Sequence, residues 1–227
     1  IITALCLCDH GIGNEDVRHL TDALQHNTIL ITLDLSFNHI TDTEVQHLAV
    51  ALKNNSTLQS LNLRSNQIRN QGAQYLADGL RYNKALTTLD LYNNGLGDNG
   101  AKYLADALEY NTTLVQLHVR WNQIGDVGAQ YLANTLRENK QLISVDLWRN
   151  EIGDKGADHL AKALRHNRTL TTLNLRLNKI TTTGAEHFRD TLQNSKALTT
   201  IYLDRNDPIQ SESNQSMEDC QIKWINL

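Results

Sequence analysis

The chain has 227 residues and a formal net charge of −4 at neutral pH. Its 21 lysine and arginine residues are outnumbered by 25 acidic residues, so the composition argues against general binding of nucleic acid or of an anionic membrane surface. The sequence contains neither an apolar run long enough to span a bilayer nor an N-terminal signal-peptide pattern. Its three cysteines make no even disulfide framework, and we therefore expect a reduced, cytoplasmic protein.

One aliphatic position recurs with a constant 28-residue period along almost the whole chain, without an insertion. It is occupied by Ile2, Leu30, Leu58, Leu86, Leu114, Leu142, Leu170 and Leu198. A fixed period in this range predicts a solenoid of stacked repeats, which remains one domain however many repeats it contains. We place this domain at residues 1–208, as seven full repeats and one partial repeat.

Each repeat begins with the pattern L-x-x-L-x-L, whose alternation predicts a short strand with one buried face. An asparagine then ends the strand, and its amide can satisfy backbone groups in a tight, stacked turn. These asparagines are Asn38, Asn66, Asn94, Asn122, Asn150, Asn178 and Asn206. Four residues later comes a residue type that is favoured as a helix N-cap. The N-cap candidates are Asn14, Asp42, Asn70, Asp98, Asp126, Asp154 and Thr182.

An amphipathic helix follows in each repeat, as in residues 128–136, where Ala129, Leu132 and Leu136 share one stripe. A glycine recurs in its first turn, where we expect the backbone to lie against the neighbouring repeat. Its copies are Gly72, Gly100, Gly128, Gly156 and Gly184. An asparagine closes nearly every helix, and we expect it in the left-handed conformation common at helix ends. These residues are Asn27, Asn55, Asn83, Asn111, Asn139 and Asn167.

A strand and a helix in every repeat predict a parallel sheet on one side and helices on the other. Helices are about 10 Å wide and strands about 4.8 Å apart, so the stack must curve with the sheet inside. The predicted fold is α/β, a right-handed leucine-rich-repeat solenoid (horseshoe) with a parallel concave β-sheet and convex α-helices. Over about residues 1–208 the repeats resemble the ribonuclease-inhibitor type of leucine-rich repeat.

The resemblance implies a non-catalytic protein that binds a protein partner on its concave face and rim. The repeats look like the sensing or regulatory end of NOD-like receptors, which would imply a role in innate immunity. They are equally similar to stand-alone repeat proteins, including inhibitors and bacterial effectors. The alternative function is that of a GTPase-activating protein of the Ran type, which also resembles this repeat class but depends on irregular loops. A third reading is a spacer or a consensus array without a partner.

The two ends of the chain carry separate expectations. The sequence starts inside the first strand without an initiator methionine, so we expect a fragment of a longer protein. Residues 209–227 are expected to form a C-terminal cap or tail. They run from a polar stretch to an apolar one that includes Ile222 and Trp224, which fits an apolar lid over the last repeat. A disordered tail is the competing interpretation.

Charges on the predicted concave face alternate with a period of two repeats. Asp90 and Asp146 are separated by two repeats, and Arg64, Arg120 and Arg176 follow one another at the same spacing. Duplication of a two-repeat unit would explain the pattern. Asp90 and Arg120 would lie on adjacent strands, two residues out of step and within reach of an arginine side chain. We therefore expect charge pairing across the sheet, for which a partner could compete.

Aromatic and arginine side chains gather where the strands end. Their composition matches that of binding hot spots, with Trp121 and Trp148 as apolar anchors. Trp148 also occupies the position at which the ribonuclease-inhibitor type displays tryptophans to its ligands. The predicted partner-binding residues are Asp90, Tyr92, His118, Arg120, Trp121, Asp146, Trp148, Arg149, Arg176, Tyr202 and Arg205.

Neither a metal site nor a catalytic site is predicted. His159 and His187 share one helix position that Tyr103 and Tyr131 fill in other repeats, and helices about 10 Å apart cannot place two imidazoles on one zinc ion. The pair Cys6 and Cys8 is read as exposed thiols rather than as a metal site. No nucleophile elbow, phosphate loop or HExxH motif is present. We expect a monomer that takes a protein partner, without cofactor, metal, nucleic acid or membrane.

Overall fold

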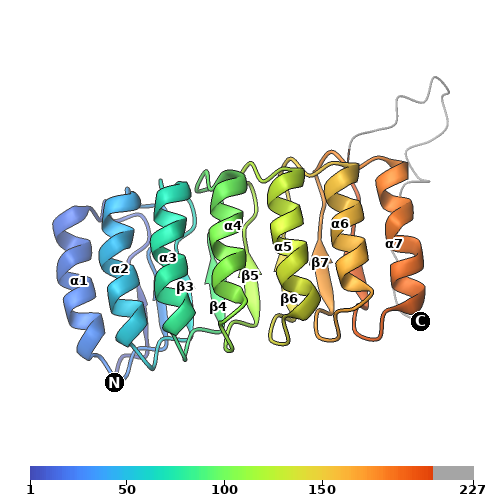
Figure 1. Ribbon diagram of the computed structural model, residues 1–227. Helices are drawn as coiled ribbons and strands as arrows, with labels where there is room; N and C mark the ends of the chain where they lie inside the picture. Colours follow the sequence, from blue (N-terminus) through green and yellow to red (C-terminus); the bar gives the residue numbers. More distant parts are fainter. Residues whose placement is uncertain (207–227) are drawn as a thin grey trace.

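A computed structural model describes residues 1–206, except the side chains of residues 190 and 194, and shows a regular alternation of strand and helix (Figure 1). The strands are β1 (Ala4–Cys6), β2 (Thr32–Asp34), β3 (Ser60–Asn62), β4 (Thr88–Asp90), β5 (Gln116–His118), β6 (Ser144–Asp146), β7 (Thr172–Asn174) and β8 (Thr200–Tyr202). The helices are α1 (Asn14–His26), α2 (Asp42–Asn54), α3 (Asn70–Tyr82), α4 (Gly97–Leu108), α5 (Asp126–Glu138), α6 (Asp154–Leu164) and α7 (Thr182–Asn194).

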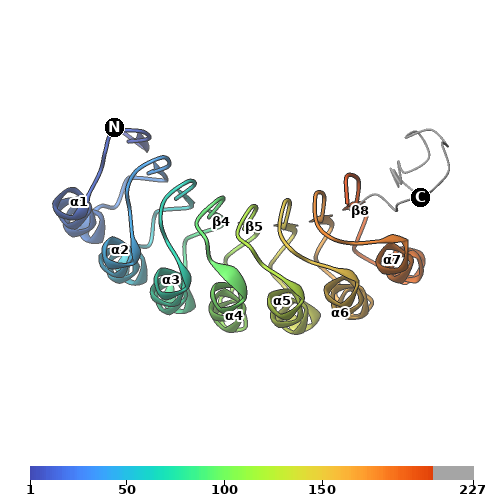
Figure 2. The ribbon, with the colours of Figure 1, turned by 90° about the horizontal axis from the view of Figure 1, so that it is seen from above.

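The strands form one parallel sheet in sequence order, and neighbouring strands pair equivalent positions of successive repeats, as in Leu33 with Leu61. Seen from above, the molecule is an arc with the helices along its outer side and the strands along its inner side (Figure 2). The predicted α/β solenoid and its curvature are confirmed. The solenoid curves because each repeat contains one helix and one strand, and a helix is wider than the spacing between strands.

The core lies between the sheet and the helices and runs unbroken through the described repeats. In the middle repeat, Leu117 of β5 and Ala129 of α5 are 1% and 0% exposed, so strand and helix close on each other completely. The buried side chains of one repeat pack on the next, so each repeat is stabilised by its neighbours.

The asparagines after the strands form a buried ladder between repeats. Asn122 is 0% exposed; its Nδ2 donates to the Leu91 carbonyl at 2.8 Å, and its Oδ1 accepts from the backbone N–H of Asn94 at 3.0 Å. A single amide thus satisfies backbone groups of the preceding repeat, as well as the carbonyl of Arg120 in its own turn. The turn predicted for these asparagines is confirmed.

The asparagines at the helix ends do not have the predicted left-handed backbone conformation. Asn83, the C-cap of α3, is extended (φ −64°, ψ 138°), and none of the six is left-handed. The Asn83 Oδ1 accepts from the backbone N–H groups of Ala85 and Leu86, and the Asn83 Nδ2 donates to the Leu52 carbonyl. The left-handed assignment was wrong because this amide serves a second inter-repeat ladder, which an extended backbone permits.

The N-cap assignment also needs correction. Helices α5 and α6 begin at Asp126 and Asp154, so these residues are the first helical residues, and the caps are the residues before them. The Asp126 carboxylate instead accepts from the backbone N–H groups of Gly153 and Gly156 at the start of α6, both at 2.8 Å. Each such aspartate therefore caps the next helix, where carboxylate and helix dipole attract.

The recurrent glycine is explained by the same contact. A Cβ on Gly156 would come 2.8 Å from Asp126 Oδ1 and 2.7 Å from Ile152 Cγ2. The first turn of each such helix is thus pressed against the preceding repeat, as the sequence predicts. In residues 1–206 no helix is both long and apolar enough to cross a membrane. The predicted cap or tail at residues 209–227 lies outside the described residues.

Candidate functional site

The candidate site begins at the last residues of strands β2 to β7, which are polar. We call them the polar column: Asp34, Asn62, Asp90, His118, Asp146 and Asn174. Asp90 Oδ1 accepts from the backbone N–H of Tyr92 at 2.9 Å, and Asp146 Oδ1 accepts from that of Trp148 at 3.0 Å. These two aspartates therefore fix the turns that carry the two aromatic residues. The contact is local, since an aspartate can hydrogen-bond its own backbone two residues further on.

The same column explains the two-repeat period of the charges. Each aspartate meets a polar side chain from the next strand through its second carboxylate oxygen, so that strands are joined in pairs. The contacts are Asn62 Nδ2 to Asp34 at 3.0 Å, His118 Nδ1 to Asp90 at 3.6 Å and Asn174 Nδ2 to Asp146 at 3.1 Å. The alternation thus has a structural role within the sheet.

The arginines pair in the direction opposite to the prediction. Arg120 Nε lies 2.8 Å from Asp146 Oδ2 on the following strand, as an ion pair without an aligned hydrogen bond, whereas Asp90 on the preceding strand faces His118. Arg176 likewise contacts Asp204, one repeat further on. Asp146 is consequently buried, although the sequence predicts an exposed residue. Charge pairing across the sheet is confirmed, but with these partners.

The groups around Asp90 favour its ionised form. Burial alone would raise the pKa of its carboxyl group. The His118 imidazole, the backbone N–H of Tyr92 and the charge of Arg120 more than offset burial, so the pKa of Asp90 lies below its ordinary value of 3.8. Asp90 is therefore ionised at neutral pH, and its carboxylate accepts the hydrogen bond from the backbone N–H of Tyr92.

Three aromatic rings meet where β4, β5 and β6 end. The Tyr92 ring packs edge-on against Trp121 with centroids 5.8 Å apart, and lies nearly parallel to Trp148 at 6.3 Å. The backbone N–H of Trp121 donates to the Trp148 carbonyl at 2.9 Å, so the turns themselves are tied together. These geometries are favourable for aromatic pairs and hold the rings in place.

Arginines cover both ends of this group of rings. The Arg149 guanidinium lies 4.2 Å from the Trp121 ring, and the Arg64 guanidinium lies 4.1 Å from the Tyr92 ring. Arg64 also stacks on Phe37 at 5.3 Å. We call these side chains the aromatic–arginine cluster: Phe37, Arg64, Tyr92, Trp121, Trp148 and Arg149.

Arg64 and Phe37 were absent from the predicted site. The signal for Arg64 was present in its two-repeat spacing from Arg120, but its stacking on Tyr92 depends on the relative height of neighbouring turns, which a sequence does not show. The predicted members Tyr92, Trp121, Trp148 and Arg149 are brought together by the fold.

A backbone feature of the cluster was not foreseen. Phe37, Trp121 and Arg149 have φ values of 54°, 50° and 53°, in the left-handed region that bulky residues rarely adopt. They share one position, the residue before the buried asparagine. Ser65, Asn93, Leu177 and Arg205 occupy the same position in other repeats and are also left-handed, so this conformation belongs to the repeat turn and its cost recurs from repeat to repeat.

The remaining predicted residues lie beside the cluster. The Arg176 guanidinium stacks on the Tyr202 ring at 4.5 Å, and Arg205 is exposed in the turn after β8. Within the described residues no ring contact joins Tyr202 to the rings of the cluster. The predicted site therefore divides into the cluster, the paired polar column and this smaller group at β7 and β8.

The part of the chain that the structure describes holds no group of three or more side chains that could bind a metal ion. Cys6 and Cys8 are free thiols with sulfurs 3.0 Å apart, and contact with Cys6 raises the pKa of the Cys8 thiol. On the helices, Tyr103 and Tyr131 are partly buried against the core. In these two repeats the position that His159 and His187 occupy elsewhere therefore packs on the core.

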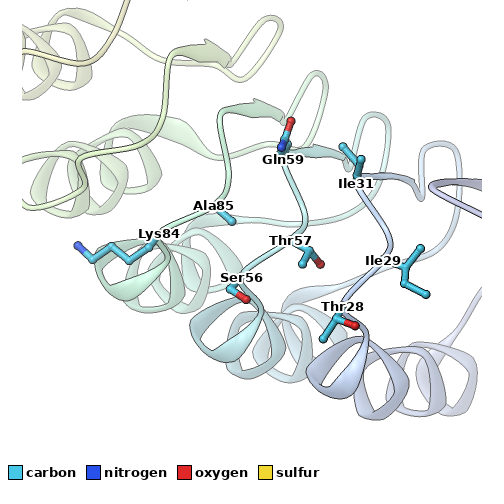
Figure 3. Close-up of a pocket in the computed structure, with 8 residues that line it drawn as sticks. All are labelled: Thr28, Ile29, Ile31, Ser56, Thr57, Gln59, Lys84 and Ala85. Atoms are coloured by element: carbon cyan, nitrogen blue, oxygen red, sulfur yellow. The ribbon is translucent and has the colours of Figure 1, made fainter.

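A shallow groove lies on the opposite rim, where helices α1 to α3 lead into the next strands (Figure 3). Its volume is about 430 Å³, and two exposed isoleucines and several hydroxyl side chains line it. Its lining residues are Thr28, Ile29, Ile31, Ser56, Thr57, Gln59, Lys84 and Ala85. Lys84 is the one charged side chain in its lining.

Comparison with solved structures finds similar chains. A chain described as the actin-binding site 2 (ABS2) of leiomodin-1 is 29% identical, with a TM-score of 0.54, and the match covers 60% of this chain and 80% of that one. Comparison with curated protein sequences finds no match.

Six segments match the family model described as Leucine Rich repeat: residues 26–48, 54–77, 82–105, 110–133, 138–161 and 166–188. The starts of the matched segments follow the period of the leucine ladder, but each segment is slightly shorter than one full repeat, because residues in the later part of each helix fall between consecutive segments. Together they span more than half of the chain. The chain therefore belongs to the leucine-rich-repeat family and is a protein-interaction module built from these repeats.

Proposed function

We propose that the chain binds a protein partner on its concave face and rim, without catalysing a reaction, and that the aromatic–arginine cluster is the centre of the interface. The observation that carries the proposal is the meeting of Tyr92, Trp121 and Trp148 under two guanidinium groups. Trp121 is 39% exposed although it is large and apolar. Tryptophan, tyrosine and arginine are the residues that dominate binding hot spots.

The mechanism is preorganisation. The rings pack on one another, and Asp90 and Asp146 hold the turns beneath them. A partner would therefore bury apolar area without first ordering the side chains, which lowers the entropic cost of association. Arg120 adds a charged group that a partner carboxylate can share with Asp146.

Two settings are compatible with this role: the sensing or regulatory repeats of a larger receptor of the NOD-like type, or a stand-alone binder like ribonuclease inhibitor. In both we propose a cytoplasmic protein that is monomeric as this chain. Leiomodin-1, by its description, contains an actin-binding site in a chain of similar structure. Actin is therefore the first partner to test.

The decisive experiment compares Trp148→Ala with Tyr110→Ala in affinity purification followed by mass spectrometry, with purified actin as a defined ligand. Tyr110 is a matched control because it is 56% exposed and lies 4.8 Å from the Arg81 guanidinium, beyond the end of α4 and away from the strand ends. Loss of Trp148 should weaken partner binding by about 2 kcal/mol, or roughly 30-fold. Loss of Tyr110 should leave it unchanged.

Melting curves followed by circular dichroism separate binding from folding. Trp148 is only partly buried, so its removal should cost about 1 kcal/mol of stability. If Trp148→Ala retains every partner while Tyr110→Ala loses them, the interface lies on the helical side and the proposal fails. A variant that simply unfolds would be replaced by Trp148→Phe, which keeps the ring stacking on Tyr92.

A further inference from the structure

The arginines of the concave surface differ in what they contact. Arg120 and Arg176 each pair with a carboxylate of the neighbouring repeat. Among the side chains that the structure describes, Arg64 and Arg149 have no carboxylate partner, and their guanidinium groups lie on aromatic rings instead. The aromatic–arginine cluster therefore carries two positive charges that nothing in the described chain neutralises, although the whole chain has a net charge of −4.

The nearby carboxylates are already engaged. Asp34 accepts from Asn62 and from its own turn, and Asp90 faces His118. A guanidinium that lies on a ring keeps its in-plane N–H donors at its edge, where a carboxylate can bind two of them at once. A bound molecule can therefore supply the countercharge for Arg64 and Arg149.

The spacing of the two cations limits the shape of that molecule. Arg64 follows β3 and Arg149 follows β6, three strand steps apart, which corresponds to roughly 14 Å. Their guanidinium groups lean toward Tyr92 and Trp121, which lie between them. An extended peptide covers such a distance with about four residues. Trp121 and Trp148 offer an apolar surface in the middle of this span.

We propose that the cluster recognises an acidic peptide segment in which two carboxylates, about four residues apart in an extended chain, flank an apolar side chain. The carboxylates bind Arg64 and Arg149, and the apolar side chain packs on Trp121 and Trp148. A nucleic acid is disfavoured because the net charge of −4 repels a polyanion. This inference rests on the proposed function and specifies the chemistry of the partner.

The test selects random dodecapeptides by phage display on the complete chain. Enriched peptides are synthesised together with a twin in which every Asp and Glu is replaced by Asn or Gln, and affinities are measured by fluorescence anisotropy. The chain is compared with the double variant Arg64→Gln/Arg149→Gln. The control is Arg137→Gln, because Arg137 lies on the helical side and pairs with Glu138 at 3.6 Å.

We expect the selected peptides to be rich in acidic residues, and to bind at least tenfold more weakly after amide replacement or to the double variant. Arg137→Gln should bind as the unaltered chain does. Equal binding of the amide twin, or tighter binding of a single-stranded oligonucleotide, would overturn the inference. If those same peptides still require Trp148, the proposed function survives. Peptides that bind Trp148→Ala normally, or a library without enrichment, count against both.

Discussion

At the scale of single residues, Trp121 combines two opposing properties. Its indole is part of the aromatic–arginine cluster, while its backbone has a φ of 50° that costs an L-residue about 1 kcal/mol. Trp121→Ala and Trp121→Gly both remove the indole, but only glycine relieves the backbone. We therefore expect Trp121→Gly to be about 1 kcal/mol more stable than Trp121→Ala in urea unfolding, with equally weak partner binding. Equal stabilities would show that the turn is not strained.

Asp90 provides a prediction about pH. Its pKa is lower in the folded protein than in the unfolded chain, so its ionised form stabilises the fold at pH values above about 4. This contribution disappears as the pH falls through the lowered pKa. Asp90→Asn should therefore be less stable than the unaltered chain at pH 7, and the two unfolding free energies should converge below about pH 4. A difference that persists undiminished in acid would indicate that the charge is irrelevant and that only packing matters.

At the scale of elements, the aspartates of the helix starts act across repeats. Asp126 lies in the first turn of α5 but accepts two hydrogen bonds from the start of α6. Asp126→Ala should cost about 1–2 kcal/mol, as the loss of a helix cap does. Native-state hydrogen exchange should speed up at Gly153 and Gly156, whereas the first turn of α5 should change little. Faster exchange confined to α5 would restore the sequence-based assignment of Asp126 as a cap of its own helix.

The elements show what a sequence can and cannot specify. The strand and helix positions were predictable because leucine spacing and residue type are local properties, and Leu117 is buried where the pattern places it. The roles of Asp126 and Asn83 were not, because their partners lie in the neighbouring repeat. A residue type favoured in a cap does not say which helix it caps.

At the scale of the whole molecule, the stacking of the repeats brings the residues of the site together. Tyr92, Trp121 and Trp148 are spread over three repeats and meet only because the sheet is parallel and in register. Composition and period were sufficient to predict these rings as neighbours on the rim. The direction in which Arg120 pairs was not predictable, since Asp90 and Asp146 are both within its reach and His118 already faces Asp90.

The array should also respond differently to equivalent cavities along its length. Leu117 of β5 is 1% exposed and is flanked in the sheet by Leu89 and Val145, whereas Leu203 is only partly buried. Truncating a buried leucine costs about 2–5 kcal/mol, and less where the site is open to solvent.

We therefore expect Leu117→Ala to lose at least twice as much unfolding free energy as Leu203→Ala, measured by urea titration on the same chain.

Because stacked repeats can uncouple, the dependence of that free energy on urea concentration must be compared too. A reduced slope for Leu117→Ala would mean that the central cavity splits the solenoid into separately unfolding halves. In that case the rings of the cluster, which come from both sides of β5, would part before the helices melt, and partner binding would be lost at lower urea than helicity. Equal losses at the two leucines would contradict the assumption that neighbouring repeats supply most of the stability.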